Sequence, residues 1–351
     1  MEESATIGMA RRSRELASTG ADVISLSLGE PDFDTPEFIK NAAIEAIRND
    51  YSHYTPIAGY PDLREAIARK LLRDNGLRYS ADEIVVSTGA KQSILNAVMA
   101  VVDPGEEVLL PAPYWVSYKE MVNLAEGEIR LIPTTVEQDY KFTAAQLEEA
   151  IGPKTRLLLF SNPCNPSGAV YDQNELADIA EVLKKHPGVY VISDEIYELI
   201  RFEGTHISMA SFHDIRDQVI TVNGLSKGFA MTGWRLGYLA AHRDVAKACD
   251  KLQGQVTSAP NSITQRAAIT ALEAEPSKVG YMKEAFRKRR ELVLKACDEI
   301  PGFRNHLPGG AFYLFPDVSF WLDRELKGKQ INTSTDLCMF LLEEAHVGLV
   351  P

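Results

Sequence analysis

Lys227 stands in the turn Gly224-Leu225-Ser226-Lys227-Gly228, which follows a predicted buried strand and precedes the apolar segment FAMTGW. A lysine in such surroundings can have a lowered amine pKa and form an imine with an aldehyde. Eight residues on, Arg235 precedes the next predicted strand, where a guanidinium can bind an anion through two hydrogen bonds. Taken alone, the two residues could also be a solvent-exposed lysine and a structural arginine.

The same pentapeptide satisfies G-x-S-x-G, the turn that presents the nucleophile of serine hydrolases, with Ser226 as the nucleophile. The motif fixes only three positions and is a weak signal. A hydrolase would also need a later acid and a histidine, for which the sequence offers Asp244 or Asp298 and His306 or His346.

An acidic residue ends another predicted strand, since Val189–Ser193 is followed by Asp194 and, three positions later, by Tyr197. A carboxylate at the end of a central strand is costly to bury without a cationic partner. A protonated ring nitrogen of a cofactor would supply that partner. The alternative is that Asp194 caps the start of a helix.

Two further loops complete a possible site. The segment 162–168, NPCNPSG, is a rigid turn that would direct the Asn165 amide inward, although it could be turn chemistry alone. The segment 87–91, STGAK, links a strand to a helix whose first N–H groups could bind a phosphate, unless it is an ordinary connection. A phosphate site, an acid for a ring nitrogen, an amide donor and an imine-forming lysine are together what pyridoxal 5′-phosphate (PLP) requires.

The elements that must position these residues alternate between short apolar runs and amphipathic stretches, which predicts a mostly parallel sheet covered by helices. We expect strands at Ile84–Ser87, Glu107–Leu110, Arg156–Phe160, Val189–Ser193, Val219–Val222 and Gly237–Ala241. Expected helices are Pro61–Asn75, Gln92–Val101, Ala144–Ala150, Asn174–His186 and Pro276–Glu299. The last helix would lead into a small α+β domain with a hairpin around Gly309-Gly310 and a helix over Thr335–Ala345.

Composition restricts the class of partner. The chain has 351 residues and a formal net charge of −12, which argues against nucleic-acid and anionic-membrane surfaces and favours small molecules. Four scattered cysteines have no metal-ligand spacing, so we expect reduced thiols and no metal site. No signal peptide is recognisable and no apolar stretch approaches the ~20 residues of a membrane span, so the sequence predicts a soluble, cytoplasmic protein.

Asn165, Asp194, Lys227 and Arg235, in this order and spacing, resemble the class I aminotransferases of the aspartate aminotransferase family, which have fold type I. The resemblance runs through SLGEPDFDTP, YTPIAGYPDLREAIA, STGAKQ, PAPYWVSY, NPCNPSG, SDEIYE, NGLSKGFAMTGWRLGY and PGGAFY. It implies a PLP-dependent α/β enzyme with a large domain at residues 31–283. The small α+β domain would comprise residues 1–30 and 284–351.

The resemblance also implies the catalytic roles. Lys227 would form the internal aldimine and later move the proton, and Asp194 would keep the pyridine nitrogen protonated. Tyr197 and Asn165 would hydrogen-bond the ring O3′, and Trp115 would stack on the ring. Phosphate contacts are implied for Gly89, Ala90, Lys91, Ser226, Arg235 and, from a neighbouring subunit, Tyr54. The last contact implies a homodimer with shared active sites.

Substrate contacts follow from the same resemblance. The Gly29 N–H would meet the substrate carboxylate beside Trp115 and Asn165, and Lys91 in its TGAKQ loop is similar to the prokaryotic subgroup, where it helps bind a dicarboxylate. Ser4 and Thr6 are implied as auxiliary contacts. Aspartate with 2-oxoglutarate, in a ping-pong cycle, is the leading pair. Prephenate, aromatic or neutral substrates, a PLP lyase and a non-catalytic PLP-binding protein remain alternatives.

One departure from the family concerns the arginine that grips the substrate α-carboxylate. In the family this arginine lies beyond the Val-Pro that follows the late apolar strand, whereas this chain stops at Val350-Pro351. The first residues already correspond to the family's SAT segment. We therefore expect the sequence to be truncated, with part of the small domain outside it.

Overall fold

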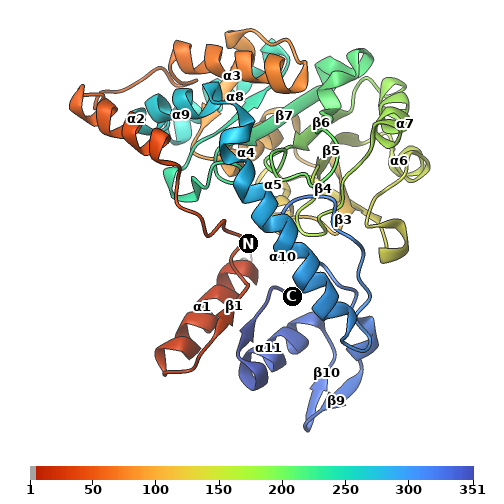
Figure 1. Cartoon of the computed structure of the whole chain (residues 1–351). Coiled ribbons are helices and arrows are strands. Elements are labelled where there is room, and N and C mark those ends of the chain that lie inside the picture. Colours follow the sequence, from red (N-terminus) through yellow and green to blue (C-terminus); the bar gives the residue numbers. More distant parts are fainter. Residues whose placement is uncertain (1–4) are drawn as a thin grey trace.

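A seven-stranded sheet forms the centre of the larger part of the molecule (Figure 1), in a computed structural model that describes the backbone of residues 5–351 and side chains from residue 8. Of these seven strands, β8 runs opposite to the other six, so the predicted mostly parallel sheet is confirmed. In spatial order the strands are β2 (Ile84–Ser87), β8 (Gly237–Ala240), β7 (Val219–Gly224), β6 (Tyr190–Asp194), β5 (Thr155–Ser161), β3 (Glu107–Ala112) and β4 (Glu128–Pro133).

Helices cover both faces of this sheet, as the near-continuous apolar strands require. Alternate residues of β2 show the division, because Ile84 and Val86 belong to one apolar cluster and Val85 to the other. The first cluster includes α2 (Glu37–Arg48), α3 (Pro61–Asn75), α6 (Ala144–Ala150), α7 (Gln173–Lys184) and α9 (Ser262–Glu273). The second includes α4 (Ala90–Val101), α5 (Ser117–Leu124) and α8 (Arg243–Val256).

The expected elements of the sheet region are found within a few residues of their predicted ends. Helix α3 matches its prediction because Pro61 begins it and Gly76, with φ of 70°, ends it. Strand β4 was not predicted, since it lies at the sheet edge and most of its residues are exposed. Its sequence EIRLIP therefore lacks the continuous apolar character of the central strands.

The smaller part of the molecule is built from both ends of the chain (Figure 1). Helix α10 (Gly280–Asp298) leads from the sheet region to β9 (Arg324–Leu326), β10 (Lys329–Ile331), α11 (Ser334–Ala345) and β11 (Val347–Gly348). Strand β1 (Ile24–Ser25) pairs in parallel with β11, and Met9 of α1 (Ala5–Ser18) clusters with Cys338 and Leu342 of α11. This arrangement agrees with a split small domain, whose boundaries stay a prediction.

The expected hairpin around Gly309-Gly310 is found only as a single antiparallel bridge, in which Arg304 and Asp317 exchange backbone hydrogen bonds of 3.0 and 2.9 Å. The two-stranded antiparallel pair of this part of the chain is β9–β10, and its turn contains Lys327 and Gly328. Gly309 and Gly310 instead donate their backbone N–H groups to the Gly168 carbonyl, at 2.9 and 3.1 Å. A Cβ on Gly310 would lie 2.7 Å from the Pro163 side chain, so this glycine permits close packing against the 162–168 turn.

Among residues 5–351, no helix is both long enough and apolar enough to cross a lipid bilayer.

Candidate active site

The predicted site residues gather at one edge of the central sheet. Strands β2, β5, β6 and β7 run in the same direction, so the loops that follow them leave the sheet at the same edge. Those loops carry Gly89, Asn165, Tyr197 and Lys227 respectively. Ligands of open α/β sheets bind at this carboxyl edge.

Lys227 is enclosed by protein rather than exposed as a surface lysine. Its Nζ donates a 2.5 Å hydrogen bond to the Gly29 carbonyl and lies 5.6 Å from the centre of the Phe312 ring. Burial lowers the pKa of Lys227 to about 8, with Glu30 opposing the shift and Arg235 adding to it. A larger fraction of the amine is therefore neutral, and nucleophilic, near physiological pH than for an ordinary lysine.

Asp194 is a buried carboxylate at the last position of β6. Its Oδ2 accepts a 2.7 Å hydrogen bond from the Tyr118 hydroxyl, and its Oδ1 accepts from the Ile196 N–H at 3.3 Å. Burial raises the pKa of Asp194 to about 6, although the Tyr118 and Ile196 hydrogen bonds oppose this shift. The helix-cap interpretation does not hold, because the chain turns after Asp194 without entering a helix.

Three polar side chains meet beside these two residues. The hydroxyls of Tyr197 and Tyr313 lie 2.6 Å apart, and the Asn165 amide donates to both, at 3.4 and 3.3 Å. Tyr313 comes from the C-terminal part of the chain and also approaches Gly29, where an added Cβ would lie 2.5 Å from its hydroxyl. Tyr313 stands in the segment PGGAFY, and no role was predicted for it from the sequence.

The predicted phosphate residues also lie together. Gly89 precedes α4 with φ of 86°, and a Cβ there would lie 2.4 Å from Nη2 of Arg235. Gly237 permits an equally close approach, since its Cβ would lie 2.2 Å from the Ala90 nitrogen. The guanidinium of Arg235 is therefore held beside the first N–H groups of a 12-residue helix, an arrangement that favours a bound anion.

Trp115 lies two residues before α5, and its ring meets the Tyr118 ring edge-on at 5.5 Å. The Lys91 ammonium lies 4.8 Å from the Trp115 ring centre. Burial, followed by the charge of Arg235, lowers the pKa of Lys91. A second anion entering here would relieve the repulsion between the two cations.

For some predicted site residues, the structure shows no contact with the cluster of side chains at the carboxyl edge of the sheet, or does not describe the side chain. Tyr54 is fully exposed, with a relative accessibility of 101%, and none of the contacts described above involves it. Ser4 and the side chain of Thr6 lie outside the described part of the molecule. Ser226 is buried, but the candidate hydrolase histidine His306 bonds instead to the Ser167 carbonyl, and His346 ends α11 on the surface.

The residues present fit PLP. Gly89 leaves room for a guanidinium beside a helix start, which suits a phosphate, and Asp194 is a buried carboxylate that a protonated ring nitrogen would neutralise. Lys227 supplies an amine of lowered pKa for the aldehyde. Tyr118 is a contact of Asp194 that was not predicted, since its position in PAPYWVSY is the one signal that the sequence offers for it.

Comparisons with known proteins agree with this chemistry. The profile of the family "Aminotransferase class I and II" matches residues 21–351. The chain is 47% identical to the bifunctional aspartate aminotransferase and glutamate/aspartate-prephenate aminotransferase of Petunia hybrida, over all of this chain and 74% of that protein. It is 43% identical to the aspartate aminotransferase of Rhizobium meliloti (strain 1021), over 97% of this chain and 84% of that protein.

Solved structures give the same result. A crystal structure of an aspartate aminotransferase from Rhizobium meliloti superposes with a TM-score of 0.96 at 42% identity, covering all of this chain and 88% of that one. The Thermus thermophilus aspartate aminotransferase with maleate superposes with a TM-score of 0.92 at 39% identity, covering all of this chain and 89% of that one. This chain therefore belongs to the class I and II aminotransferase family and is a PLP-dependent aminotransferase.

Proposed function

We propose that this enzyme transfers the amino group of L-aspartate to 2-oxoglutarate in a ping-pong cycle. Lys91 carries the choice of substrate. Its ammonium lies over the Trp115 ring and near Arg235, where it can bind the distal carboxylate of a dicarboxylic substrate. Names of relatives support a second candidate acceptor, prephenate, since the protein from Rickettsia bellii is a "probable aspartate/prephenate aminotransferase" at 45% identity.

The proposed cofactor contacts follow the grouping of the side chains. The N–H groups of Gly89, Ala90 and Lys91, the Ser226 hydroxyl and the Arg235 guanidinium would hold the phosphate. Asp194 would bind the ring nitrogen, Trp115 would pack on the ring, and Tyr197 with Asn165 would bind the ring hydroxyl. Bound PLP supplies an aldehyde for the amino group and a ring that withdraws electrons from the substrate Cα.

Lys227 then has two tasks in the proposed mechanism. Its amine would hold the aldehyde of the cofactor, and the same amine would take the proton from the substrate Cα as a general base. The lowered pKa suits this base, because a neutral amine is present near neutral pH. The N–H of Gly29, whose carbonyl already contacts Lys227, places the substrate carboxylate next to that amine.

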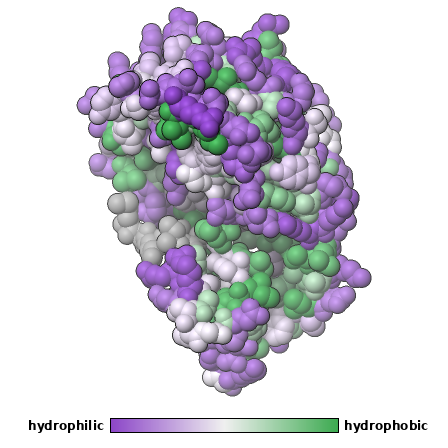
Figure 2. All heavy atoms as spheres, turned by 60° about the vertical axis from the view of Figure 1, so that its left-hand side comes forward, coloured by the Kyte–Doolittle hydropathy of each residue, from purple (hydrophilic) through white to green (hydrophobic). Residues whose placement is uncertain are grey.

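The proposed assembly is a cytoplasmic homodimer in which Tyr54 binds the phosphate in the partner's site. Full exposure of Tyr54 supports a role across an interface, and other large apolar side chains are exposed near it in sequence, among them Ile44, Ile47 and Ile57. Figure 2 shows hydrophobic residues interrupting the hydrophilic surface in several places on one face. The four cysteines are unpaired, which supports a reducing compartment.

A panel of amino donors tests the substrate. Reconstituted enzyme is mixed with each amino acid, and conversion of the bound cofactor to its amine form is followed by absorbance. L-aspartate should react fastest, and Lys91→Met should raise the KM for aspartate about tenfold while leaving that for alanine within about twofold, the loss expected for one charge-assisted contact. Lys247→Met, on the exposed face of α8, is the control.

Two results would contradict the proposal. Faster reaction with an aromatic or neutral amino acid than with aspartate would overturn the substrate, and release of pyruvate or ammonia without the amine form would indicate a lyase. Assays of the second half-reaction with 2-oxoglutarate and with prephenate separate the two acceptors.

A further inference from the structure

The segment between α2 and α3 that carries Tyr54 is bonded to side chains from the interior of the protein. Residues 51–60, the Tyr54 loop, form neither helix nor strand, and Tyr54 is fully exposed among them. Segments of this kind are ordinarily among the more mobile parts of a molecule. Two glutamines that are 0% exposed, Gln265 of α9 and Gln253 of α8, nevertheless form hydrogen bonds with this loop.

Gln265 bonds to the loop at two points. Its Nε2 donates to Oγ1 of Thr55 at 3.0 Å and to the Pro260 carbonyl at 2.8 Å, and its Oε1 accepts from the Tyr60 N–H at 2.8 Å. The amide nitrogen and the amide oxygen therefore both have partners, as a buried amide requires. One bond holds the residue directly after Tyr54, and another holds the end of the loop.

Gln253 holds the middle of the same loop. Its Nε2 donates to the Ile57 carbonyl at 2.9 Å and to the Val86 carbonyl of β2 at 2.8 Å. The Ala58 carbonyl also accepts a 3.0 Å hydrogen bond from the Val86 N–H. The loop is thus joined to the strand that leads to Gly89.

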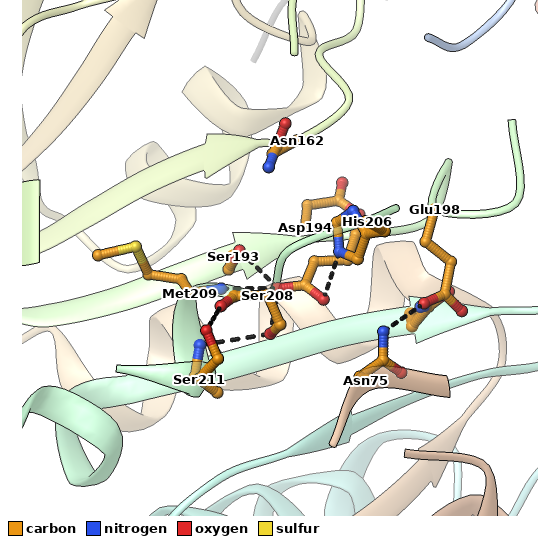
Figure 3. A network of polar contacts seen from close by, with 12 residues as sticks. Asn75, Asn162, Ser193, Asp194, Glu198, His206, Ser208, Met209 and Ser211 are labelled. Carbon is orange, nitrogen blue, oxygen red and sulfur yellow. Dashed lines mark hydrogen bonds and ion pairs between the residues drawn. The ribbon is translucent and has the colours of Figure 1, made fainter. Parts of the chain in front are cut away.

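The two ends of the loop are fixed as well. At its start, Oγ of Ser262 donates a 2.6 Å hydrogen bond to the Tyr51 carbonyl. At its end, α3 begins at Pro61 and is tied to the sheet region, since Asn75 donates a 3.0 Å hydrogen bond to Glu198, which follows β6 (Figure 3). The loop therefore lies between two fixed ends, and its own contacts decide where its tip points.

We propose that Gln265 is a positioning residue, which holds the loop so that Tyr54 can bind the cofactor phosphate of the partner subunit. This inference rests on the proposed contact of Tyr54 across the dimer. A loop that is already ordered loses less conformational entropy when its tip binds than a free loop does. The hydrogen bonds of Gln265 go to Thr55, Tyr60 and Pro260, which are not among the residues of the candidate site. Its effect should therefore appear in the partner's site.

Mixed dimers separate an effect on the partner's site from an effect within the same protomer. Two affinity tags isolate dimers in which one protomer carries Lys227→Ala, so that only the site of the other protomer gives the visible absorbance of PLP bound to lysine. Titration of the cofactor-free mixed dimer with PLP, followed by this absorbance, gives the dissociation constant of that single site. The mixed dimer with no substitution besides Lys227→Ala is the reference.

Gln265→Leu is placed in either protomer of the mixed dimer. In the Lys227→Ala protomer it should weaken PLP binding to the other site about fivefold, because that site would receive a less ordered Tyr54. In the protomer whose site is measured, it should change the affinity less than about twofold. An equal loss in both placements would show that Gln265 acts through the structure of its own protomer, and an unchanged affinity in both would show that it has no role. Either result overturns the inference.

Tyr54→Phe in the Lys227→Ala protomer tests the contact on which the inference rests. It should weaken PLP binding to the other site about tenfold, the loss expected for a hydrogen bond to a phosphate. Adding Gln265→Leu to the same protomer should then cost less than about twofold more, because the two residues act through one contact. No effect of Tyr54→Phe would overturn the proposed role of Tyr54 and the inference with it. An effect of Tyr54→Phe without one of Gln265→Leu would overturn the role of Gln265 alone.

Gln218→Leu in the Lys227→Ala protomer is the matched control. Gln218 is also buried, but it precedes β7 and donates to the His186 and Val189 carbonyls at the amino edge of the sheet, at 2.9 and 2.8 Å. This control should leave the affinity of the other site unchanged, and a loss equal to that of Gln265→Leu would contradict the inference.

A second variant decides the question if Gln265→Leu does not fold. Thr55→Val breaks the same contact from the loop side and leaves Gln265 in place. In the Lys227→Ala protomer it should weaken the other site about threefold, since one of the two bonds from Gln265 to the loop remains. An unchanged affinity would then overturn the role of Gln265.

Discussion

The hydroxyl of Tyr118 donates a 2.7 Å hydrogen bond to Oδ2 of Asp194, and both side chains are buried. This contact joins α5, which follows the Trp115 loop, to the end of β6. The same Tyr118 ring packs edge-on against Trp115, so one side chain supports both the ring-nitrogen ligand and the residue proposed to stack on the cofactor. The orientation of Asp194 therefore depends on a neighbour outside its own strand.

Tyr118→Phe should weaken PLP binding about tenfold, because Asp194 loses a hydrogen bond worth about 1–1.5 kcal/mol. Equilibrium dialysis of the cofactor-free protein measures the effect. Tyr171→Phe is the matched control, since Tyr171 is also buried but accepts its hydrogen bond from Phe142 N. The control should lower the free energy of unfolding without affecting PLP affinity, and equal losses of affinity in both variants would contradict this prediction.

Because the pKa of Asp194 is raised to about 6 from a usual 3.8, the free energy of unfolding of the cofactor-free protein should depend on pH. Between pH 3.8 and about 6 the folded state binds more protons than the unfolded state. The stabilising contribution of Asp194 to the free energy of unfolding is therefore fully present below pH 3.8 and is lost as the pH rises through about 6. Asp194→Asn should therefore be more stable than the parent at pH 8, by about 2–3 kcal/mol.

Urea unfolding of both proteins, without cofactor, at pH 5 and pH 8 checks this. The stability difference between variant and parent should shrink at the lower pH, since Asp194 is then largely protonated. A difference that is independent of pH would show that Asp194 ionisation is not costly. With PLP present, the parent should be more stable than Asp194→Asn at pH 8, because the variant lacks the carboxylate that pairs with the ring nitrogen.

Lys227 should react with electrophiles at lower pH than exposed lysines do, since burial lowers its pKa to about 8. Competitive acetylation of the cofactor-free protein across a pH series, followed by peptide mass spectrometry, gives the midpoint for each lysine. Exposed Lys184, whose pKa is raised by its hydrogen bond with Asp214, is the internal control. A midpoint for Lys227 at or above that of Lys184 would rule out the activated amine.

Lys227→Ala should lack the visible absorbance that PLP acquires when bound to the lysine. Its activity should fall about a thousandfold or more, as expected when a catalytic nucleophile and base is removed. Ser226→Ala separates the aminotransferase from the hydrolase interpretation of the same turn. It should keep that absorbance and only weaken PLP binding. Persistence of the absorbance in Lys227→Ala would disprove the central assignment.

Gly29→Ala should impair substrate binding, because its Cβ would lie 2.5 Å from the Tyr313 hydroxyl and one of the two must move. We expect KM for aspartate to rise by about tenfold, in the range of overpacking costs of 1–3 kcal/mol. Adding Tyr313→Phe removes the closest atom and should restore part of the loss. No rescue in steady-state kinetics of the double variant would show that the two residues do not interact in the enzyme.

Local sequence was sufficient for the sheet and for most of the proposed site. Apolar runs identified the buried strands, and the turns after them carry Gly89, Asn165, Asp194 and Lys227, because a loop stays attached to the strand that precedes it. Edge strand β4 was not predicted, and the hairpin expected around Gly309-Gly310 is reduced to a single bridge. One lacks a continuous apolar run, and the other has glycines that serve tight packing against a distant turn.

Tertiary structure alone decided the partners of those residues. Tyr118 lies 76 positions from Asp194, and Tyr313 lies 116 from Tyr197 and 148 from Asn165. No periodicity or motif relates residues at such separations, since hydrogen bonds between them depend on how helices and strands pack after folding. The sequence by itself determined which groups stand at the edge of the sheet. Packing determined how each is oriented, how far it is buried and, through burial, how its pKa is shifted.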